Sequence, residues 1–377
     1  MDLREQWIET ELEELRRAQR FRRAVTPPPG LLNFSSNDYL NLAQHPDVIA
    51  AAERALHAAG AGATASRLVS GTLPLHEELE ARLARLKGYP AALLFGSGYL
   101  ANLGILGALV GRGDTVFADR LAHASLMDAA LLSRAELCRF RHNDTQHLDE
   151  LLQKHSGAGR KLVVTESVFS MDGDVAPLPE LAAVAERHGA LLLVDEAHAT
   201  GVFGPGGSGL IREHQLESKV NLSMGTLSKA LGGYGGFVAC STAMRALLIN
   251  RARAFIYTTA PPPAAVGAAL GALDVLEKNP GWGAELLRHA AAFRDQLRAA
   301  GFDVMQSASQ IIPIQVGANA RALEVADKLR AAGLLAIAIR PPTVPEGTAR
   351  LRLSITRAHS ETDLARALDI IRSVCAV

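Results

Sequence analysis

Apolar residues recur along the chain in two patterns that alternate with each other. The runs AALLF (91–95) and ALLLV (190–194) are continuously apolar, which is typical of strands covered on both faces. Between such runs, segments such as 99–110 and 179–189 carry apolar residues at helical spacing. The alternation predicts an α/β fold with a mainly parallel sheet between layers of helices.

Both ends of the chain depart from this alternation. Residues 3–20 have the pattern of an amphipathic helix, which we expect to dock on another surface, and TPPPG (26–30) predicts a stiff link. From about residue 282 the pattern is that of a small α+β domain, whose last helix should begin at Ser360 with Asp363 completing a capping box. We therefore predict an N-terminal helix and linker at 1–45, a large α/β domain at 46–281 and a small α+β domain at 282–377.

Composition and charge exclude several classes of protein. The 377 residues include 39 Lys+Arg and 39 Asp+Glu, so no net charge attracts nucleic acid or an anionic membrane. Three widely spaced cysteines, Cys138, Cys240 and Cys375, predict neither a disulfide framework nor a zinc site. The N-terminus is too charged for a signal peptide, and no apolar run is long enough to span a membrane. We expect a cytoplasmic globular protein.

Candidate chemistry lies after the predicted strands, where ligands bind in parallel sheets. Asp195 ends one strand, in DEAHATG, and His198 follows three residues later. A buried carboxylate is costly unless a cation or strong donors meet it. Lys229 stands in TLSKALGG, between a hydroxyl-rich turn and a group of glycines. Each of these residues, taken alone, is explained at least as well by a structural role.

A glycine turn follows the strand AALLF. The pattern Gly96-x-Gly98-x-x-Ala101 fits the dinucleotide fingerprint, and Asp119 ends a strand about 20 residues later. By itself this favours a nicotinamide dehydrogenase, with Asp114 or Asp119 as the ribose ligand. The same turn would place bare amides and a helix N-terminus against the phosphate of any cofactor. The turn therefore predicts a phosphate site without identifying the cofactor.

Other strand ends carry further polar residues. His123 follows the strand that ends at Asp119, and TESVFSMDGD places Glu166 and Ser170 after another strand, where they also suit a turn. In ARLRLSIT, Arg350 and Arg352 share one face of a strand. An inward arginine there could grip a carboxylate in bidentate fashion, although a solvated strand face is an equally good explanation.

Together these features describe the needs of one cofactor, pyridoxal phosphate. This cofactor requires a lysine for its Schiff base, an acid at the pyridinium nitrogen, an anion site for its phosphate and often a flat ring over its face. Lys229, Asp195, the turn at Gly98 and His123 could supply these four. The glycines after Lys229, at 232, 233, 235 and 236, would allow close approach of the cofactor.

At this point the chain resembles the α-oxoamine synthases, pyridoxal-phosphate enzymes of the aspartate aminotransferase fold (fold type I). The resemblance covers nearly the whole chain and rests on motifs that occur in order: LFGSGYLAN, DRLAHASL, TESVFSMDGD, VDEAHATG, TLSKALGG and IYTTAPPP. It implies a seven-stranded-type sheet in the large domain and a homodimer with active sites at the subunit interface. The stretch RPPTVPEGTARLRLS indicates the branch that condenses L-alanine with a pimeloyl thioester, carried on coenzyme A or acyl carrier protein, in biotin biosynthesis.

The resemblance also implies a role for each matching residue. Lys229 would form the Schiff base with the cofactor, Asp195 would pair with the ring nitrogen, and His123 would stack on the ring. The remaining assignments are His198 at the phenolic oxygen, Gly98 and Tyr99 at the phosphate, Ser170 and Thr226 on the cofactor, Thr258 at the other subunit's phosphate, Arg352 at the amino-acid carboxylate, Thr343 on the substrate path, and Arg22, with Arg20 and Arg23 as neighbours, at the acyl substrate.

Alternatives stay open at this stage. A sister enzyme would use glycine with a short acyl-CoA, and a non-catalytic pyridoxal-phosphate protein or the dehydrogenase are more distant possibilities. One departure from the family concerns the loop GAGATASR (60–67), where the family usually has GSGGSR. The added bulk of Ala63 and Thr64 should alter that loop and any ligand contact it makes.

Overall fold

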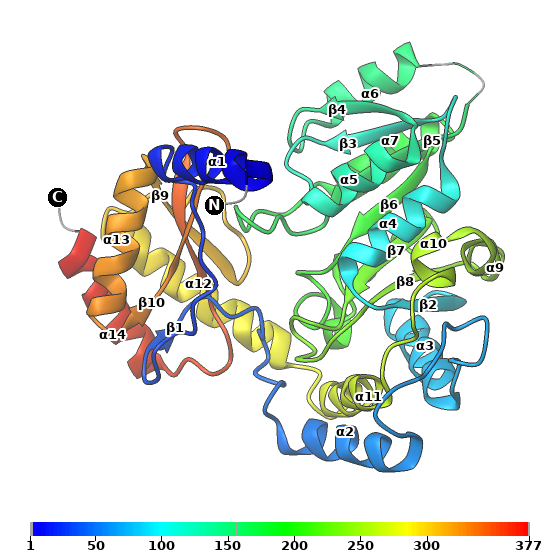
Figure 1. The fold of residues 1–377 in the computed structure, drawn as a ribbon, viewed down its shortest axis with the longest axis horizontal. Helices are drawn as coiled ribbons and strands as arrows, with labels where there is room; N and C mark the ends of the chain where they lie inside the picture. Colours follow the sequence, from blue (N-terminus) through cyan, green and yellow to red (C-terminus); the bar gives the residue numbers. More distant parts are fainter. Residues whose placement is uncertain (1–2, 156, 158, 376–377) are drawn as a thin grey trace. The chain divides into compact units, whose positions relative to one another are not determined.

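The computed structural model describes residues 3–155, 157 and 159–375, which fall into two compact units. The large unit comprises residues 37–170 and 174–288, and the small unit comprises 3–36, 171–173 and 289–375. Figure 1 shows the elements of each unit in sequence colours. The three-part division predicted from the sequence stays a prediction.

A seven-stranded sheet forms the centre of the large unit, in the order β2-β8-β7-β6-β5-β3-β4 (Figure 1). Only β8 runs antiparallel to its neighbours, so the predicted mainly parallel sheet is confirmed. The strands are β2 (Ala91–Phe95), β3 (Thr115–Asp119), β4 (Glu136–Phe140), β5 (Lys161–Glu166), β6 (Leu191–Asp195), β7 (Leu222–Thr226) and β8 (Gly236–Cys240).

Helices cover both faces of this sheet, because its strands are apolar on both sides. One core joins α4 (Gly98–Leu109) and α5 (Ala124–Ser133) to strand residues such as Val116 and Leu193. The alternate residues Phe117 and Leu192 are equally buried and face the other side, where α6 and α7 contact the strands. The remaining helical bounds are α2 (Pro46–Ala59), α3 (Pro74–Lys87), α6 (Thr145–Lys154), α7 (Leu178–Arg187), η2 (Pro205–Gly207), α8 (Leu210–Glu213), α9 (Thr242–Arg251), α10 (Arg253–Ile256), α11 (Pro263–Lys278) and α12 (Trp282–Ala299).

The small unit contains two short sheets. An antiparallel sheet has the order β11-β12-β9, and a parallel pair joins β1 to β10. The bounds are η1 (Leu3–Glu5), α1 (Gln6–Arg17), β1 (Leu32–Asn33), β9 (Ile311–Gly317), α13 (Asn319–Ala331), β10 (Leu334–Leu335), β11 (Ile337–Ile339), β12 (Ala349–Ser354) and α14 (Glu361–Cys375). The capping box of α14 is confirmed: Asp363 N donates to Ser360 Oγ at 3.1 Å, and Ser360 N donates to Asp363 Oδ2 at 2.9 Å.

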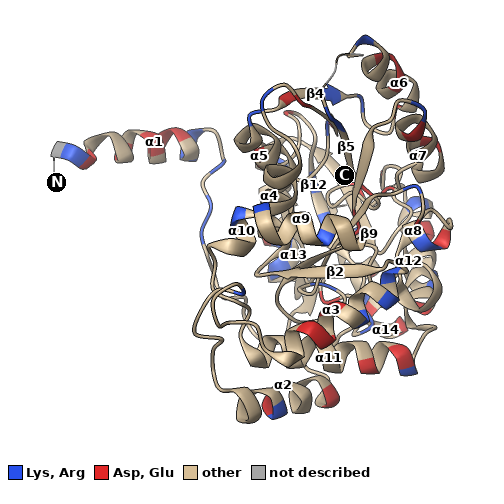
Figure 2. Ribbon diagram, turned by 90° about the vertical axis from the view of Figure 1, so that its right-hand side faces the viewer, with Lys and Arg blue, Asp and Glu red and all other residues tan. Residues whose placement is uncertain are grey.

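The N-terminal helix forms as predicted, but no residue of α1 is buried in the structure. Trp7 keeps 65% of its surface exposed, although the apolar face of α1 should favour contact with a partner surface. The docking of α1 on another surface therefore stays a prediction. Figure 2 shows acidic residues along the middle of α1 and basic residues towards its C-terminal end, so this helix carries both signs of charge.

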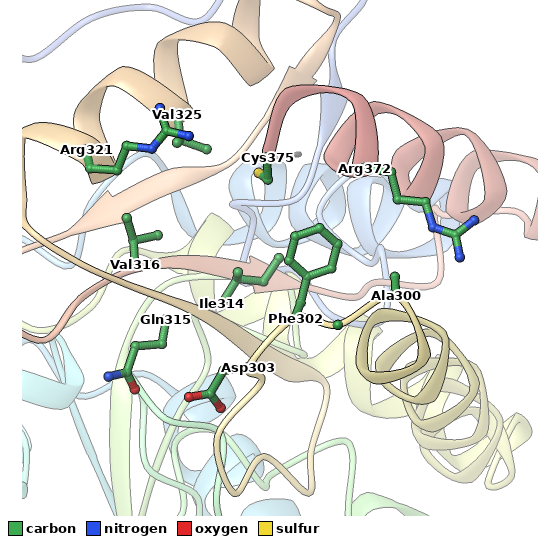
Figure 3. Close-up of a pocket in the computed structure, with 11 residues that line it drawn as sticks. Ala300, Phe302, Asp303, Ile314, Gln315, Val316, Arg321, Val325, Arg372 and Cys375 are labelled. Carbon is green, nitrogen blue, oxygen red and sulfur yellow. The ribbon is translucent and has the colours of Figure 1, made fainter. Parts of the chain in front are cut away.

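None of the helices in the described part of the chain combines the length and apolar character needed to cross a membrane. A cavity of about 630 Å³ lies in the small unit, where Phe302, Ile314 and Val325 are among the residues that line it (Figure 3). None of the site residues predicted from the sequence lines this cavity. Its shape alone therefore does not locate the active site.

An ion-pair cluster fastens the segment after β4 inside the large unit. His142 Nδ1 lies 3.0 Å from Asp119 Oδ1, and His142 Nε2 lies 2.7 Å from Asp174 Oδ2. Because both carboxylates accept, both ring nitrogens carry protons and the imidazole is charged. Burial alone would lower the pKa of His142, but its bonds to the two carboxylates outweigh burial and raise the pKa to about 9.

We predict that His142→Gln loses stability in a pH-dependent way. The folded-state pKa lies above the unfolded value, so the His142 contribution is complete below about pH 6.5 and disappears as pH rises through about 9. The difference in free energy of unfolding between wild type and variant should therefore shrink by up to about 3 kcal/mol across this range. Urea unfolding at several pH values measures it, with the exposed His57→Gln as control. A difference that is constant with pH would contradict the ion-pair assignment.

Candidate active site

The register of the sheet brings the polar strand ends to one edge. Phe95 of β2 and Thr226 of β7 both pair with Gly236 of β8, so the glycine turn after Phe95 lies near the end of β7. On the other side of β7, Asp195 pairs with Met224 and also with Glu166. The carboxyl ends of these strands thus meet where an open α/β sheet binds its ligand.

Lys229 belongs to a chain of polar groups at this edge. Its Nζ lies 3.0 Å from Nε2 of His198, and Nδ1 of His198 lies 2.6 Å from the Tyr39 hydroxyl. His198 and Tyr39 are buried, and Lys229 is half-buried. The structure therefore brings together Lys229 and His198, as the sequence predicts, and adds Tyr39 as the group that orients the imidazole.

Asp195 begins a second chain of hydrogen bonds. Its Oδ1 accepts from Ala197 N at 2.9 Å, and its Oδ2 accepts from Asn102 Nδ2 at 3.0 Å. Asn102 Nδ2 also donates to Ser125 Oγ at 2.9 Å, and that hydroxyl lies 2.8 Å from His123 Nδ1. Asp195 and His123, far apart in the sequence, are thus linked through two buried polar side chains on α4 and α5.

His123 caps the N-terminus of α5 and leaves its ring accessible. Its Nδ1 accepts from Ser125 N at 3.2 Å, so in the neutral imidazole the proton resides on Nε2. Although the side chain reaches solvent, the protein atoms around it desolvate the ring and lower the pKa of His123; Asp195 opposes this shift and Lys229 adds to it. The result is a neutral, flat ring held by one nitrogen at the site edge.

Glu166 is a second buried carboxyl next to Asp195. Burial, and then the charge of Asp195, raise the pKa of Glu166 well above its usual range. It accepts hydrogen bonds from the backbone of His123 and Ser170. Its Oε1 is buried without a partner among the described residues. The raised pKa favours the protonated form of Glu166 beside Asp195.

Glu196, the residue after Asp195 in the motif DEAHATG, is held by its own set of buried partners. Its side chain is fully buried and pairs with Lys87, which is equally buried. Ser223 Oγ donates to it at 3.1 Å and Ile211 N at 3.0 Å. A Cβ at Gly209 would lie 2.5 Å from its carboxylate oxygens, so that position must lack a side chain. Every hydrogen bond that Glu196 needs is therefore present without solvent.

The glycine turn forms a bare helix N-terminus. Ser97 caps α4, its Oγ accepting from Leu100 N at 3.2 Å, and Gly98 is the first helical residue. A Cβ at Gly236 would lie 2.5 Å from the backbone of Ser97, which explains the glycine there. Thr226 Oγ1 lies 2.8 Å from Ser228 Oγ beside this turn. Free amides and hydroxyls at a helix N-terminus suit a phosphate.

Three further predicted residues lie in the large unit with other immediate partners. Tyr99 is exposed and donates to Asp128 Oδ2 at 2.6 Å. Ser170 is buried after β5. Thr258 donates to Ala254 O at 2.6 Å, just after α10. Their cofactor contacts stay predictions.

The small unit holds Arg22, Thr343 and Arg352, whereas His123, the fourth predicted substrate residue, belongs to the large unit. Arg22 Nη2 donates to Thr343 Oγ1 at 3.2 Å, so two residues assigned to one substrate path are in contact. Arg20, the competing candidate, is paired with Glu346. Arg350 is paired with Asp172, whereas Arg352 donates to Ser354 Oγ at 2.9 Å. Of the two arginines on one strand face, Arg350 is therefore committed to a carboxylate of the protein itself.

The loop 60–67, where the sequence departs from the family motif, contains an unusual backbone conformation. Thr64 adopts a φ of 62°, in the left-handed region where a β-branched residue is strained. Ala63 is buried beside it. Thr64 is therefore held in a conformation that disfavours its side chain, and the effect of the departure on ligand contacts stays a prediction.

Comparison with known proteins identifies the family. The model of aminotransferase class I and II matches residues 29–371. The chain belongs to this family. An 8-amino-7-oxononanoate synthase from Geobacter sulfurreducens is 52% identical over 348 residues, with 92% of this chain and 89% of that protein covered. Another, from Anaeromyxobacter dehalogenans, is 51% identical over 365 residues, with 94% and 91% covered.

Solved structures agree. A serine palmitoyltransferase from S. paucimobilis with bound PLP-myriocin aldimine superposes with a TM-score of 0.92, at 33% identity and full coverage of both chains. An 8-amino-7-oxononanoate synthase from Francisella tularensis gives 0.79, at 31% identity, covering 92% of this chain and 98% of that one. These findings confirm the resemblance to α-oxoamine synthases and the fold class. The protein is an enzyme whose cofactor is pyridoxal phosphate.

The residues present fit this cofactor. The two hydrogen-bonded networks, one at Lys229 and one at Asp195, contain the groups that the cofactor needs: a lysine amine, a buried carboxylate and an accessible imidazole. Near Asp195, Asn102 Oδ1 and Glu166 Oε1 are buried without hydrogen-bond partners among the described residues, as expected where a polar ligand enters.

The nicotinamide alternative has lost its support. Both acids that could have bound a ribose are committed to the protein: Asp114 pairs with Arg160, and Asp119 holds His142 and the backbone amide of Asn143. The sequence could not show these contacts of Asp119, because His142 and Asn143 lie more than 20 residues away from it.

Sequence reasoning missed three residues of this aminotransferase-family site, namely Tyr39, Asn102 and Ser125. Tyr39 stands in the irregular stretch NFSSNDYLNL, and Ser125 follows His123 in DRLAHASL, both within motifs that carried the resemblance. Asn102 was the detectable one, because it is a polar residue on a helix whose other inward positions are apolar.

We predict that Glu166→Gln is at least as stable as wild type at neutral pH, because glutamine imitates the protonated carboxyl. The folded pKa of Glu166 lies above its unfolded value, so wild type loses stability as pH rises from the usual carboxyl range towards that raised pKa. The variant should not show this loss. Urea unfolding at about pH 5 and about pH 9 tests it, with the exposed Glu53→Gln as control. A variant that is less stable than wild type at both pH values would show that the folded enzyme uses the carboxylate.

Proposed function

We propose that this enzyme condenses L-alanine with a pimeloyl thioester to give 8-amino-7-oxononanoate, CO₂ and free thiol, in biotin biosynthesis. The observation that carries the proposal is the contact of Lys229 with His198 beside buried Asp195, in a chain 52% identical to a relative of that name. The thioester would be carried on coenzyme A or on acyl carrier protein.

Residues of the large unit would hold the cofactor. Asp195, as the anion kept by Asn102 and Ala197, would hold a proton on the ring nitrogen. His123 would cover the ring and His198 would meet its phenolic oxygen. Gly98 and Tyr99 would lie at the phosphate, and Ser170 and Thr226 would also contact the cofactor. When bound, pyridoxal phosphate supplies an electron-accepting ring that stabilises negative charge at the α-carbon of the amino acid.

Lys229 would move the protons. Its Nζ can take the α-proton of alanine once the substrate amine has displaced it, and can later return a proton to the product. His198, held through Tyr39, stands 3.0 Å from this amine and would keep it oriented between the two steps. The glycines that follow would leave room for the side chain to move aside.

His123 would act on the acyl donor. Its neutral form carries the proton on Nε2, the nitrogen left accessible by the bond of Nδ1 to Ser125. This N–H can donate a hydrogen bond to the thioester oxygen as negative charge develops there, and the ring can orient the condensed product. The low pKa of His123 favours this neutral form at neutral pH.

The substrates would be recognised by arginines. Arg352 would bind the carboxylate of alanine, for which a guanidinium is well suited. Arg22 and Thr343, which are in contact, would line the acyl path. In a homodimer, Thr258 would reach the phosphate bound in the other subunit.

Serine palmitoyltransferase is the second candidate activity, because solved structures of that name superpose with TM-scores up to 0.92. Their identity is 33%, against 52% for the 8-amino-7-oxononanoate synthase relative. The higher identity favours the pimeloyl reaction. A sister enzyme that uses glycine and a short acyl-CoA is the remaining alternative, and the choice of substrates distinguishes it in the same way.

We predict a preference for L-alanine with pimeloyl-CoA in a matrix of donors and amino acids. Thiol release is measured with pimeloyl-, acetyl-, succinyl- and palmitoyl-CoA, each with alanine, glycine and serine. One methylene or methyl group in a pocket is worth about 1–3 kcal/mol, so the preference should be about tenfold or more. Fastest release with serine and palmitoyl-CoA, or with glycine and acetyl-CoA, would replace the proposal. Binding of the cofactor without thiol release from any of these pairs, or from pimeloyl-acyl carrier protein with alanine, would leave a non-catalytic protein.

We predict that Lys229→Ala keeps the fold but lowers the rate of thiol release by more than about 10³-fold, because both proton transfers lose their group. Borohydride should fix the cofactor to wild type at Lys229 and fail to do so in the variant. The exposed Lys278→Ala serves as the control and should behave as wild type. A fully active Lys229→Ala enzyme would exclude the central assignment.

A further inference from the structure

A carboxylate, a thiol and an imidazole lie close together beside β4, the edge strand of the large unit's sheet. Glu136 and Cys138 are two residues apart on β4, so their side chains point to the same face. His155 follows the last residue of α6, which packs against β4. Glu136 begins β4, so this group lies at the amino edge of the sheet, whereas the candidate active site lies at the carboxyl edge.

The three donor atoms have the spacing of a metal ligand set. His155 Nε2 lies 3.3 Å from Cys138 Sγ and 3.3 Å from Glu136 Oε1, and Cys138 Sγ lies 3.9 Å from Glu136 Oε1. Tetrahedral zinc bonds of roughly 2.0–2.3 Å place neighbouring ligand atoms about 3.4–3.6 Å apart. Shifts of a few tenths of an ångström would therefore bring all three atoms into a common coordination sphere.

The imidazole is already oriented for this. His155 Nδ1 lies 2.8 Å from Leu151 O, which can only accept, so Nδ1 carries a proton. Metal-bound histidines usually donate their second nitrogen to such a carbonyl. The ring also meets Phe117 edge-on, with centroids 5.5 Å apart. In the neutral imidazole, Nε2 therefore presents its lone pair to Cys138 and Glu136.

The group then contains more acceptors than protons. Neutral Nε2 and the Glu136 carboxylate are both acceptors at 3.3 Å, and the Cys138 thiol can donate its single proton to only one of them. A cation placed among the three atoms satisfies them all. Protonation of His155 to form an ion pair with Glu136 is the competing solution, and it binds no metal.

We propose that Glu136, Cys138 and His155 form a peripheral zinc site. One thiolate and one carboxylate neutralise the divalent charge, and the thiol proton is released to solvent as the metal–sulfur bond forms. Sulfur and imidazole favour zinc over magnesium or calcium. Glu136 is 62% exposed, which leaves the fourth position open to water. Bound zinc would tie the edge strand to the end of α6.

Zinc binding to the pyridoxal-phosphate-loaded enzyme tests the proposal. Metal content after gel filtration and competition with a chromophoric chelator give stoichiometry and affinity. Cobalt is the second probe, because the visible d–d bands of a tetrahedral cobalt–thiolate site lie at longer wavelengths than cofactor absorption. The variants are Cys138→Ser, His155→Gln and Glu136→Gln. Cys375→Ser, another partly buried cysteine, is the matched control.

We expect one zinc per chain, binding weakened more than about tenfold in Cys138→Ser and His155→Gln, and no change in Cys375→Ser. Zinc should raise the melting temperature of wild type but not of Cys138→Ser. Thiol-release activity should be unchanged in the metal-free variants, which also shows that they are folded. Unchanged zinc affinity in folded Cys138→Ser, or no saturable binding at micromolar zinc, would overturn the proposal.

Discussion

The buried pair of Glu196 and Lys87 is the constraint on which the site depends. Two full charges without solvent are tolerated only when every hydrogen bond is made, and here a lysine, a serine hydroxyl and a backbone amide meet the carboxylate. Neighbouring side chains at a strand end point to opposite faces. Holding Glu196 on the α3 side therefore turns Asp195 towards α4, where Asn102 receives it.

Burial and neighbouring charges also control the protonation of the side chains at the carboxyl ends of the strands. Asp195 and Glu166 pair across adjacent strands, and two buried anions there would repel each other strongly. The raised pKa of Glu166 favours its protonated form, which would leave a single carboxylate to meet the cofactor nitrogen. His123 is kept neutral by its surroundings, and the lysine stands against an imidazole that Tyr39 positions. Pyridoxal phosphate requires a lysine amine and a carboxylate at its ring nitrogen, and Lys229 and Asp195 could supply these two groups.

Sequence patterns found most of the elements and the principal residues of the site. Lys229, His198 and Asp195 were identified because they follow strands, and the register confirms that those strands end at one edge. Sequence patterns were less informative where the role of a residue depends on its hydrogen-bond or ion-pair partner. Nothing in the pattern ARLRLSIT distinguishes Arg350, which an aspartate of the protein neutralises, from Arg352. Likewise, Asp119 looks like a ligand-binding acid until His142 is seen beside it.

The sequence by itself determined the alternation of strands and helices, the family and the cofactor, because apolar periodicity and contiguous motifs are local properties of the chain. Only the tertiary structure decided which polar groups are already satisfied. Tyr39 reaches His198 across 159 residues, and Asn102 reaches Asp195 across 93. The tertiary structure also placed His155 against Cys138, although the spacing of cysteines alone predicted no zinc site. Hydrogen bonds and charges act over a few ångströms, and only the folded chain brings such distant residues that close.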